Sequence, residues 1–472
     1  MFVLGILFFI SLLKGSQSYL KLPLGTQRFN FKKNEYHKKI KLDLPEQQMS
    51  IVKKINGFYG LIGPDVKMKD ANNIYKLFMG DGIIQGCFFD NGELTFTRQY
   101  VKTDKLLYEE KNGKIPQNNF YHLLFMLLNE VKLLPNILGL ANTVIMKIKN
   151  FSRGINNPQN RFYALYERDL PYEINIDFIN KQISTIGKVD IYGLKHFSAH
   201  SIVNDERDMV ESIDYDVMKN HFIYHLLNND LQLYKTINIK TQYMPVIHDF
   251  ISTNYSVIFT DSPLTMEHSK MNVNEIPVSL VVGKPTFINV LNKVSSDVSK
   301  YKFNNSFYIF HYAQWEEDDY HISIYAPVYD ELELSKIDIH GFYRKIYIHK
   351  FTGEVTMEKN PVLEKLNLDF PVKFGEDKVI LRNIKDRICD GFVICKGLDI
   401  VHKIFLENRF ACGEHRVFEI EGKPYLISYT FNINNNKEGF ITIIDLDTYK
   451  IIEIPLGTEL YFGFHSIYCD NK

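Results

Sequence analysis

The sequence predicts an all-β fold in which short strands, joined by tight turns, build one large closed structure. Two stretches carry this prediction. Asp90-Asn91-Gly92 lies between apolar runs, which is a strong β-hairpin signal. Pro245–Phe259 also reads as a hairpin, because apolar and β-branched residues flank the polar pair Thr253-Asn254. Although 472 residues can hold two or three average domains, a closed all-β fold can use this length as one.

Composition narrows the functional class. The net charge of −1 gives no polyanion-binding signal, so nucleic acid is not an expected partner, and no protein partner is evident. The sequence contains no Gly-rich phosphate loop, which leaves phosphoryl chemistry without support. The five cysteines are scattered without metal-ligand spacing, and this odd, sparse set predicts reduced thiols in place of a disulfide framework.

The N-terminal segments differ from the rest of the chain. Residues 1–18 contain an apolar run, Phe2–Leu13, followed by Lys14 and a small polar stretch, which predicts a signal peptide or an apolar N-terminal anchor. This run is too short for a comfortable membrane span. Residues 19–48 are polar and basic, and we expect them to form a flexible lead-in. The remainder, 49–472, is then a single domain.

The apolar N-terminal run also bears on localisation. We expect a membrane-associated protein that enters the secretory pathway, with a cytosolic peripheral membrane protein as the alternative. Three N-x-S sequons accompany this expectation, at Asn150, Asn254 and Asn304. Asn254 lies in the predicted hairpin Pro245–Phe259 and is a poor glycan site if that turn packs closely.

Phe120–Leu140 is the one long helix-like segment. Its apolar residues cover nearly the whole circumference of a helix, interrupted by a few polar positions. Two interpretations remain open at this point. The segment is either a buried core helix or an apolar patch that dips into one leaflet of a membrane.

Four histidines stand in apolar or aromatic surroundings. A single histidine in a strand, such as His248 between Ile247 and Asp249, is usually a hydrogen-bonded core residue. Three further histidines share this kind of setting, and together the four favour a metal site: His200, His248, His311 and His465.

The motifs around these histidines resemble those of the carotenoid cleavage oxygenases. They are His-Asp-Phe followed by a polar turn and Asn-Tyr, then Phe-His with Trp-Glu-Glu a few residues on, then Gly-Phe-His near the end. The resemblance extends from about Ile55 to His465. It implies a seven-bladed β-propeller, with a few helices capping the tunnel face, whose axis carries one non-haem Fe(2+) ion held by His200, His248, His311 and His465. Dioxygen is then the co-substrate.

The resemblance also assigns residues around the metal. Thr143 matches a threonine whose side chain crowds an open iron position, and Glu167 matches the first of three glutamates that orient the histidines. Asp369 stands where the second glutamate is expected, and a shorter carboxylate must sit closer to its imidazole. Glu414 matches the third, with Glu419 as the fallback. His196 precedes His200 by four residues, but the Ala-His pair favours His200.

Four neutral imidazoles leave two positions of an octahedral ion free, enough for dioxygen and a water. The other nitrogen of a bound ring donates outward, and carboxylates such as Glu167 and Glu414 would accept those protons, which fixes tautomer and ring angle. Intrinsic affinity favours copper or zinc over ferrous iron, so iron is implied by the resemblance alone.

The function implied is cleavage of a conjugated carbon–carbon double bond of a carotenoid or apocarotenoid into two carbonyl products. Lipophilic polyene substrates favour membrane contact through 120–140 over a core helix. Stilbene cleavage is an alternative. The stilbene-cleaving branch carries a lysine at the position of Tyr166, and the tyrosine here counts against that alternative. Retinoid isomerisation is another. A non-catalytic lipophile-binding propeller is a third, and it has no need of four histidines.

Overall fold

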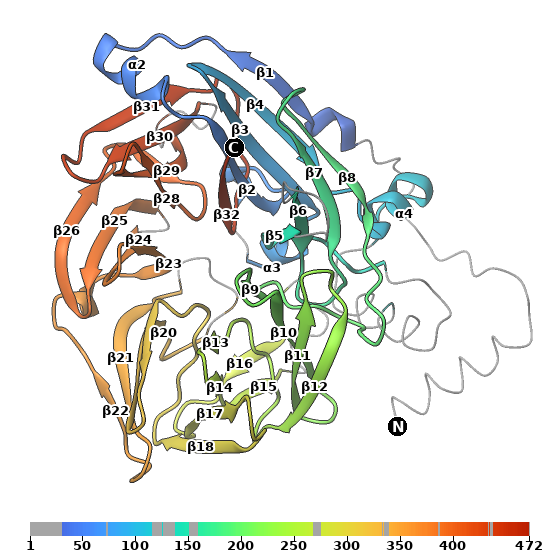
Figure 1. Ribbon diagram of the computed structural model, residues 1–472, viewed down its shortest axis with the longest axis vertical. Helices are drawn as coiled ribbons and strands as arrows, with labels where there is room; N and C mark the ends of the chain where they lie inside the picture. The colour runs from blue at the N-terminus through green and yellow to red at the C-terminus, as the bar shows by residue number, and fades with distance from the viewer. Residues whose placement is uncertain are drawn as a thin grey trace, which may run out of the picture.

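The computed structural model shows a seven-bladed β-propeller, which confirms the predicted fold class (Figure 1). The seven blades are arranged around a central axis in chain order, and the first blade also receives the C-terminal strand. The structure describes residues 31–71, 74–115, 125, 137–150, 159–267, 275–332, 334, 339–385, 388–432, 434 and 438–471.

The first blade closes the ring by combining both ends of the propeller. Its strand order is β1-β4-β3-β2-β32, so that the C-terminal strand pairs antiparallel with β2 (Figure 1). The predicted hairpin at Asp90-Asn91-Gly92 joins β3 to β4, and both Asn91 and Gly92 have positive φ, as this type of two-residue turn requires. The bounds are β1 Tyr36–Ile40, β2 Gly57–Pro64, β3 Gly82–Asp90, β4 Glu93–Tyr100 and β32 Ser466–Asp470.

The next three blades are four-stranded antiparallel sheets, and in the third of them a small two-stranded sheet, β15-β16, is inserted between β14 and β17. The strands of these sheets are β5 Val144–Asn150, β6 Gln159–Leu165, β7 Tyr172–Asp177, β8 Gln182–Lys188, β9 Ile202–Asn204, β10 Met209–Asp216, β11 His221–Asn228, β12 Leu233–Lys240, β13 Ile251–Ser252, β14 Ser256–Asp261, β15 Leu264–Met266, β16 Val278–Leu280, β17 Thr286–Asn292 and β18 Val298–Phe303.

The last three blades complete the ring. In the seventh blade, both β27 and β28 pair with β29. Their strands are β19 Gln314–Glu317, β20 His321–Val328, β21 Phe342–His349, β22 Val355–Glu358, β23 Leu368–Phe374, β24 Lys378–Lys385, β25 Ile388–Lys396, β26 Asp399–Phe405, β27 Arg409–Ala411, β28 Arg416–Ile420, β29 Lys423–Asn432, β30 Gly439–Asp445 and β31 Ile451–Pro455. The short helices are η1 Phe31–Asn34, α2 Glu46–Val52, η2 Met68–Asp70, α3 Ile74–Met79, α4 Asp104–Asn112 and η4 Leu363–Lys365.

Burial along the strands follows their place in a blade. Every residue of β2 and β14 is buried, because neighbouring blades cover both faces of these strands. In β12, at the outer edge of its blade, buried or half-buried residues alternate with exposed ones, as expected when one face meets solvent. The blades thus pack face to face, and their innermost strands surround the axis.

The structure shortens the predicted flexible lead-in. Residues 36–40 fall inside the segment 19–48, yet they form β1 and pair with β4, from Tyr36 opposite Arg98 to Ile40 opposite Leu94. Phe31 is buried against Tyr100. The lead-in therefore does not extend to residue 48, because a backbone ladder formed with a distant strand holds its second half.

Two predicted segments lie mostly outside the described residues. Residues 1–18, the predicted signal peptide or anchor, lie outside them entirely, and of 120–140 only residues 125 and 137–140 are described. Phe125 is described, is 1% exposed and packs with Ile115, Ile137 and Leu138. In the part of the chain that the structure describes, no helix is both long enough and apolar enough to cross a membrane.

Candidate metal centre

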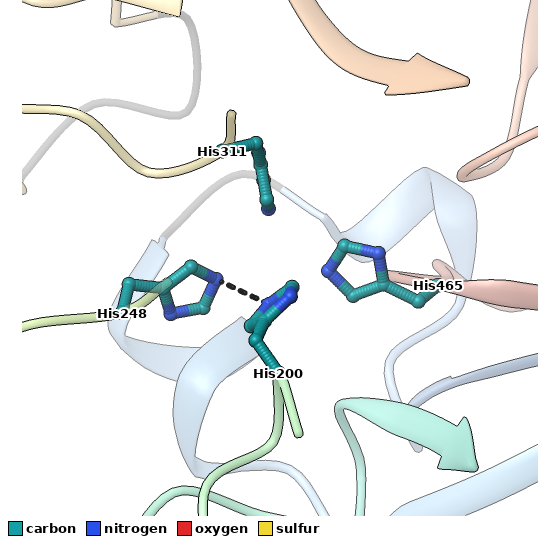
Figure 2. Close-up of side chains that lie close together, drawn as sticks. All are labelled: His200, His248, His311 and His465. Atoms are coloured by element: carbon teal, nitrogen blue, oxygen red, sulfur yellow. Dashed lines mark hydrogen bonds between the residues drawn. The ribbon is translucent and has the colours of Figure 1, made fainter. Parts of the chain in front are cut away.

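The structure brings the four histidines of the resemblance together on the axis of the propeller (Figure 2). One ring nitrogen of each lies within 4.8 Å of the corresponding nitrogens of the others. Each histidine stands just before the innermost strand of a blade. His200 precedes β9, His248 precedes β13, His311 precedes β19 and His465 precedes β32. The closed ring of blades therefore brings four positions that are far apart in sequence to one point.

The hairpin interpretation of Pro245–Phe259 placed His248 within a strand, and this placement is wrong. The hairpin exists, but its first strand is only Ile251–Ser252, paired with Val257 and Ile258. His248 lies in the extended segment that leads into this strand. The same is true of the other three histidines, because a side chain at the end of an inner strand reaches the axis whereas residues further along the strand pack against neighbouring blades.

Three of the four rings point their outward nitrogen at a carboxylate. His248 Nδ1 contacts Glu167 Oε1 directly. His311 Nδ1 lies 2.7 Å from Asp369 Oδ1. His465 Nδ1 lies 3.2 Å from Glu414 Oε1. With the proton on Nδ1, the Nε2 lone pair of each ring is directed to the centre, which is the arrangement that metal-binding histidines use.

Each carboxylate is fixed by a further donor. Tyr215 donates its hydroxyl to Glu167 at 3.3 Å, and Tyr329 donates to Asp369 at 2.7 Å. The backbone N–H of Ser466 donates to Glu414 at 2.9 Å. The three carboxylates come from blades other than those that carry the histidines they contact. Ring orientation therefore depends on how the blades pack against one another.

Asp369 occupies the place where the resemblance implies a glutamate, and the backbone around it is irregular. The pairing of β23 with β24 shifts register between Asp369 and Val372. Phe370 has a φ of 53°, and its N–H donates to Asp369 Oδ1 at 2.7 Å. A positive φ is uncommon for a bulky residue. This irregularity accompanies the close approach that the shorter side chain needs in order to reach His311.

His200 differs from the other three rings. Its nearest carboxylate oxygen, Oδ1 of Asp249, lies 4.0 Å from Nδ1, which is too far for a hydrogen bond. Asp249 instead accepts from the backbone N–H groups of Phe250 at 2.7 Å and Tyr312 at 3.1 Å. Alternation along a strand places Asp249 on the face opposite His248, and this gives no indication that Asp249 lies beside His200. The His-Asp-Phe motif gives no signal for that neighbour.

Protonation in the cluster follows from burial and from the carboxylates. Burial and the neighbouring rings hold the pKa of His200 well below its usual range. Burial lowers the pKa of His465 to about 4, even though Glu414 acts against it. Burial also acts to lower the pKa of His311, but Asp369 outweighs it, and that pKa lies above the ordinary value. A cation at the centre would oppose protonation of His311 as well.

The donor set fits a divalent metal ion. Nε2 of His311 is buried and has no hydrogen-bond partner among the described residues. Nε2 of His200 lies 3.0 Å from Nε2 of His248 (Figure 2). Because Glu167 accepts the proton of His248 Nδ1, the Nε2 lone pair of His248 points toward the centre. Such a concentration of nitrogen lone pairs is stabilised by a cation bound between them.

A cavity of about 370 Å³ opens over three of the histidines, His248, His311 and His465. Most of its lining is apolar, for example Phe78, Phe310 and Leu332, and α3 forms part of the wall. Thr143 also lines it, with its hydroxyl donating to Asn142 Oδ1 at 3.0 Å. Thr143 therefore lines the same cavity as three of the four histidines. The cavity places apolar surface beside the histidine cluster.

Other residues weighed from the sequence lie outside the centre. His196 pairs with Asp214 at 3.2 Å. Glu419, the fallback for Glu414, is exposed on β28. Trp315 and Glu316 are exposed on β19. The four cysteines that the structure describes with their side chains are buried thiols, as the sequence predicts.

Comparison with known proteins agrees with the motifs. The family model described as retinal pigment epithelial membrane protein matches residues 39–374. A carotenoid 9,10(9′,10′)-cleavage dioxygenase 1 from Arabidopsis thaliana is 27% identical over 478 residues, covering 89% of this chain and 85% of the relative. The protein of the same name from Phaseolus vulgaris is 26% identical over 346 residues, covering 67% of this chain and 60% of the relative.

Solved structures show the same fold. A variant of the Synechocystis apocarotenoid oxygenase aligns with a TM-score of 0.72 at 16% identity, covering 96% of this chain and 98% of that one. The lignostilbene dioxygenase of Pseudomonas brassicacearum aligns with a TM-score of 0.70 at 17% identity, covering 95% and 97%. At such low identity these likenesses concern the fold alone.

Proposed function

The chain belongs to the carotenoid cleavage oxygenase family, and from that premise we propose that it is an iron(II)-dependent dioxygenase. It splits one conjugated carbon–carbon double bond of a carotenoid or apocarotenoid. Each carbon of that bond receives one oxygen atom of dioxygen, so two carbonyl fragments result. The observation that carries the proposal is the four-histidine cluster, with three of its rings braced by carboxylates, beneath an apolar cavity.

His200, His248, His311 and His465 would hold the ion. When bound, iron(II) would supply the coordination positions at which dioxygen is activated. Glu167, Asp369 and Glu414 hold the proton on Nδ1 of their histidines and keep the rings in place. The apolar cavity binds the polyene by the hydrophobic effect and keeps bulk water away from the centre.

Thr143 narrows the space beside the centre, because it is buried and lines the same cavity as three of the histidines. Its hydroxyl is committed to Asn142, which leaves the methyl group free to exclude water on that side. This role restricts what can approach the ion; it requires no proton transfer by Thr143.

Metal analysis of the purified protein, combined with product mass spectrometry, tests the proposal. β-Carotene and apocarotenals are supplied as substrates, with stilbenes as a separate arm. We expect about one iron per chain and two carbonyl products from a polyene. Removing iron with a chelator abolishes cleavage, and adding ferrous iron restores it. Cleavage of stilbenes in preference to polyenes, or an isomer formed without dioxygen, would overturn the assignment.

Membrane contact through 120–140 is a second part of the proposal, supported by the low solubility of polyenes in water. Phe125 is already buried in the protein, so other apolar residues of the segment would make the contact. The test replaces Leu127 and Leu128 with aspartate and measures sedimentation with liposomes. We expect release from the liposomes with unchanged turnover of detergent-solubilised substrate. Entry into the secretory pathway rests on residues 1–18, and loss of that segment from the mature protein tests it.

A further inference from the structure

Arg382 is a buried arginine in the wall of the metal-centre cavity. It lies on β24 opposite Asp369, lines the cavity and is 3% exposed. Its Nε and Nη1 have no hydrogen-bond partner among the described residues. No carboxylate of the described residues forms an ion pair with Arg382. Its closest defined contact is the ring of Phe370, 4.7 Å from Cζ. A buried cation without an anionic partner is strongly disfavoured.

Among the described residues, the other two buried arginines have hydrogen-bond acceptors for their guanidinium groups. Arg344, 2% exposed, forms bidentate contacts with Asp330 and Glu364. Arg98 donates to the backbone oxygens of Asn34 and Glu459. Arg168, which is only half-buried but shares the cavity with Arg382, donates to Asp214 and to the backbone oxygen of Tyr215. The fold thus supplies acceptors for its buried guanidinium groups, and Arg382 is an exception among those compared.

The position of Arg382 relates it to the reacting centre. The Phe370 ring under its guanidinium lies 5.0 Å from the His311 ring and 5.3 Å from the His465 ring, measured between centroids. One aromatic ring therefore separates the cation from the candidate metal centre. Tyr75 adds a second polar group to the same cavity, with its buried hydroxyl also lacking a partner among the described residues. An apolar polyene satisfies neither group.

We propose, on the basis of the proposed function, that Arg382 selects polyenes with an oxygenated end group, above all a terminal carboxylate. A planar guanidinium binds a carboxylate through two parallel hydrogen bonds, and it binds an aldehyde oxygen more weakly. The apolar wall holds the chain of the substrate while Arg382 fixes its end. That contact sets the depth of insertion, and with it the double bond that lies over the centre.

The test measures equilibrium binding of three polyenes of equal length that end in a carboxylate, an aldehyde or a methyl group. Wild-type protein is compared with Arg382→Met and Arg382→Lys. For each ligand the ratio of dissociation constants between variant and wild type is taken, which cancels differences in solubility. We expect Arg382→Met to weaken the acid about 10- to 100-fold, the aldehyde less, and the hydrocarbon hardly at all. Arg382→Lys should recover part of the loss for the acid.

Arg168→Gln is the matched control, because Arg168 lines the same cavity but already has partners, and it should leave the order of preference unchanged. Ligand-free Arg382→Met should melt at or above the temperature of the wild type, since it removes an unpaired buried charge. Equal ratios for all three ligands would overturn the proposal. So would unfolding of Arg382→Met, which would assign Arg382 a packing role. Because binding needs no turnover, a protein that selects the acid but cleaves nothing would refute the proposed function while leaving this inference intact.

Discussion

The candidate metal centre has two parts that are built differently. His248, His311 and His465 are each held by a carboxylate that is itself held by another donor. Among the described residues, no carboxylate lies within hydrogen-bond distance of the His200 ring, so other neighbouring groups orient it. Its backbone N–H donates to Ser198 Oγ at 3.0 Å, and its ring lies against the other three rings.

This difference separates two ways of fixing a ligand. The three paired rings keep their tautomer through an ionic hydrogen bond, which raises the basicity of the inward nitrogen. His200 is fixed by packing, and its pKa is held low by burial and by the neighbouring rings. The two parts should therefore respond unequally to loss of their supporting residues, although they should respond alike to loss of a ring.

Replacing a ring should have the largest effect. His311→Ala and His200→Ala should both lose metal and cleavage activity, by more than the roughly 10- to 100-fold expected for loss of an outer partner. Metal content by mass spectrometry and activity check this, with His196→Ala as the control outside the centre. A variant that keeps full metal occupancy would remove that histidine from the ligand set.

Removing a supporting carboxylate should cost less. In Glu414→Gln the side chain keeps its size but loses its charge, and metal affinity or activity should fall roughly 10- to 100-fold. Glu419→Gln is the matched control, because Glu419 is exposed on the neighbouring strand. Competition with a chelator measures the affinity. Equal affinities of the two variants would show that Glu414 does not act on His465.

The Asp369 contact should show how closely the backbone is fitted to a short carboxylate. Asp369→Ala leaves the Tyr329 hydroxyl and the His311 N–H without their acceptor, so it should approach the effect of Glu414→Gln. Asp369→Glu adds a methylene where three donors already converge, and it should cost about 1–3 kcal/mol of stability with less than a tenfold loss of affinity. Thermal unfolding and chelator competition measure the two effects. If Asp369→Ala behaves like the wild type, Asp369 has no role in orienting His311.

Sequence reasoning anticipated much of this arrangement, because each candidate ligand stands in a short motif. The motifs also indicated the positions of Glu167, Asp369 and Glu414, even where the residue type departed from the pattern. The hairpin at Asp90-Asn91-Gly92 was predictable because the turn chemistry is local.

What escaped prediction depends on contacts between distant segments. Strand β1 forms because β4 offers an edge far along the chain, so 36–40 looked like part of a flexible lead-in. Alternation along the strand relates Asp249 only to His248, and it does not predict that Asp249 lies beside His200 from another blade. In the sequence, Arg382 has the features of an ordinary strand residue. Only the three-dimensional structure shows that its Nε and Nη1 have no hydrogen-bond partner among the described residues.

The smallest effect should come from Asp249→Asn. Asp249 Oδ1 lies 4.0 Å from Nδ1 of His200, so the substitution breaks no hydrogen bond to the ring. Asparagine keeps one oxygen that can accept from the backbone N–H of Phe250 or Tyr312. We expect metal affinity to fall by less than in Glu414→Gln, because the substitution removes only a Coulomb interaction that acts across the His200 ring. Chelator competition, run beside Glu414→Gln, decides the matter. A loss as large as that of Glu414→Gln would mean that Asp249 closes on His200 when metal binds, and the contrast between the two parts of the centre would then not hold.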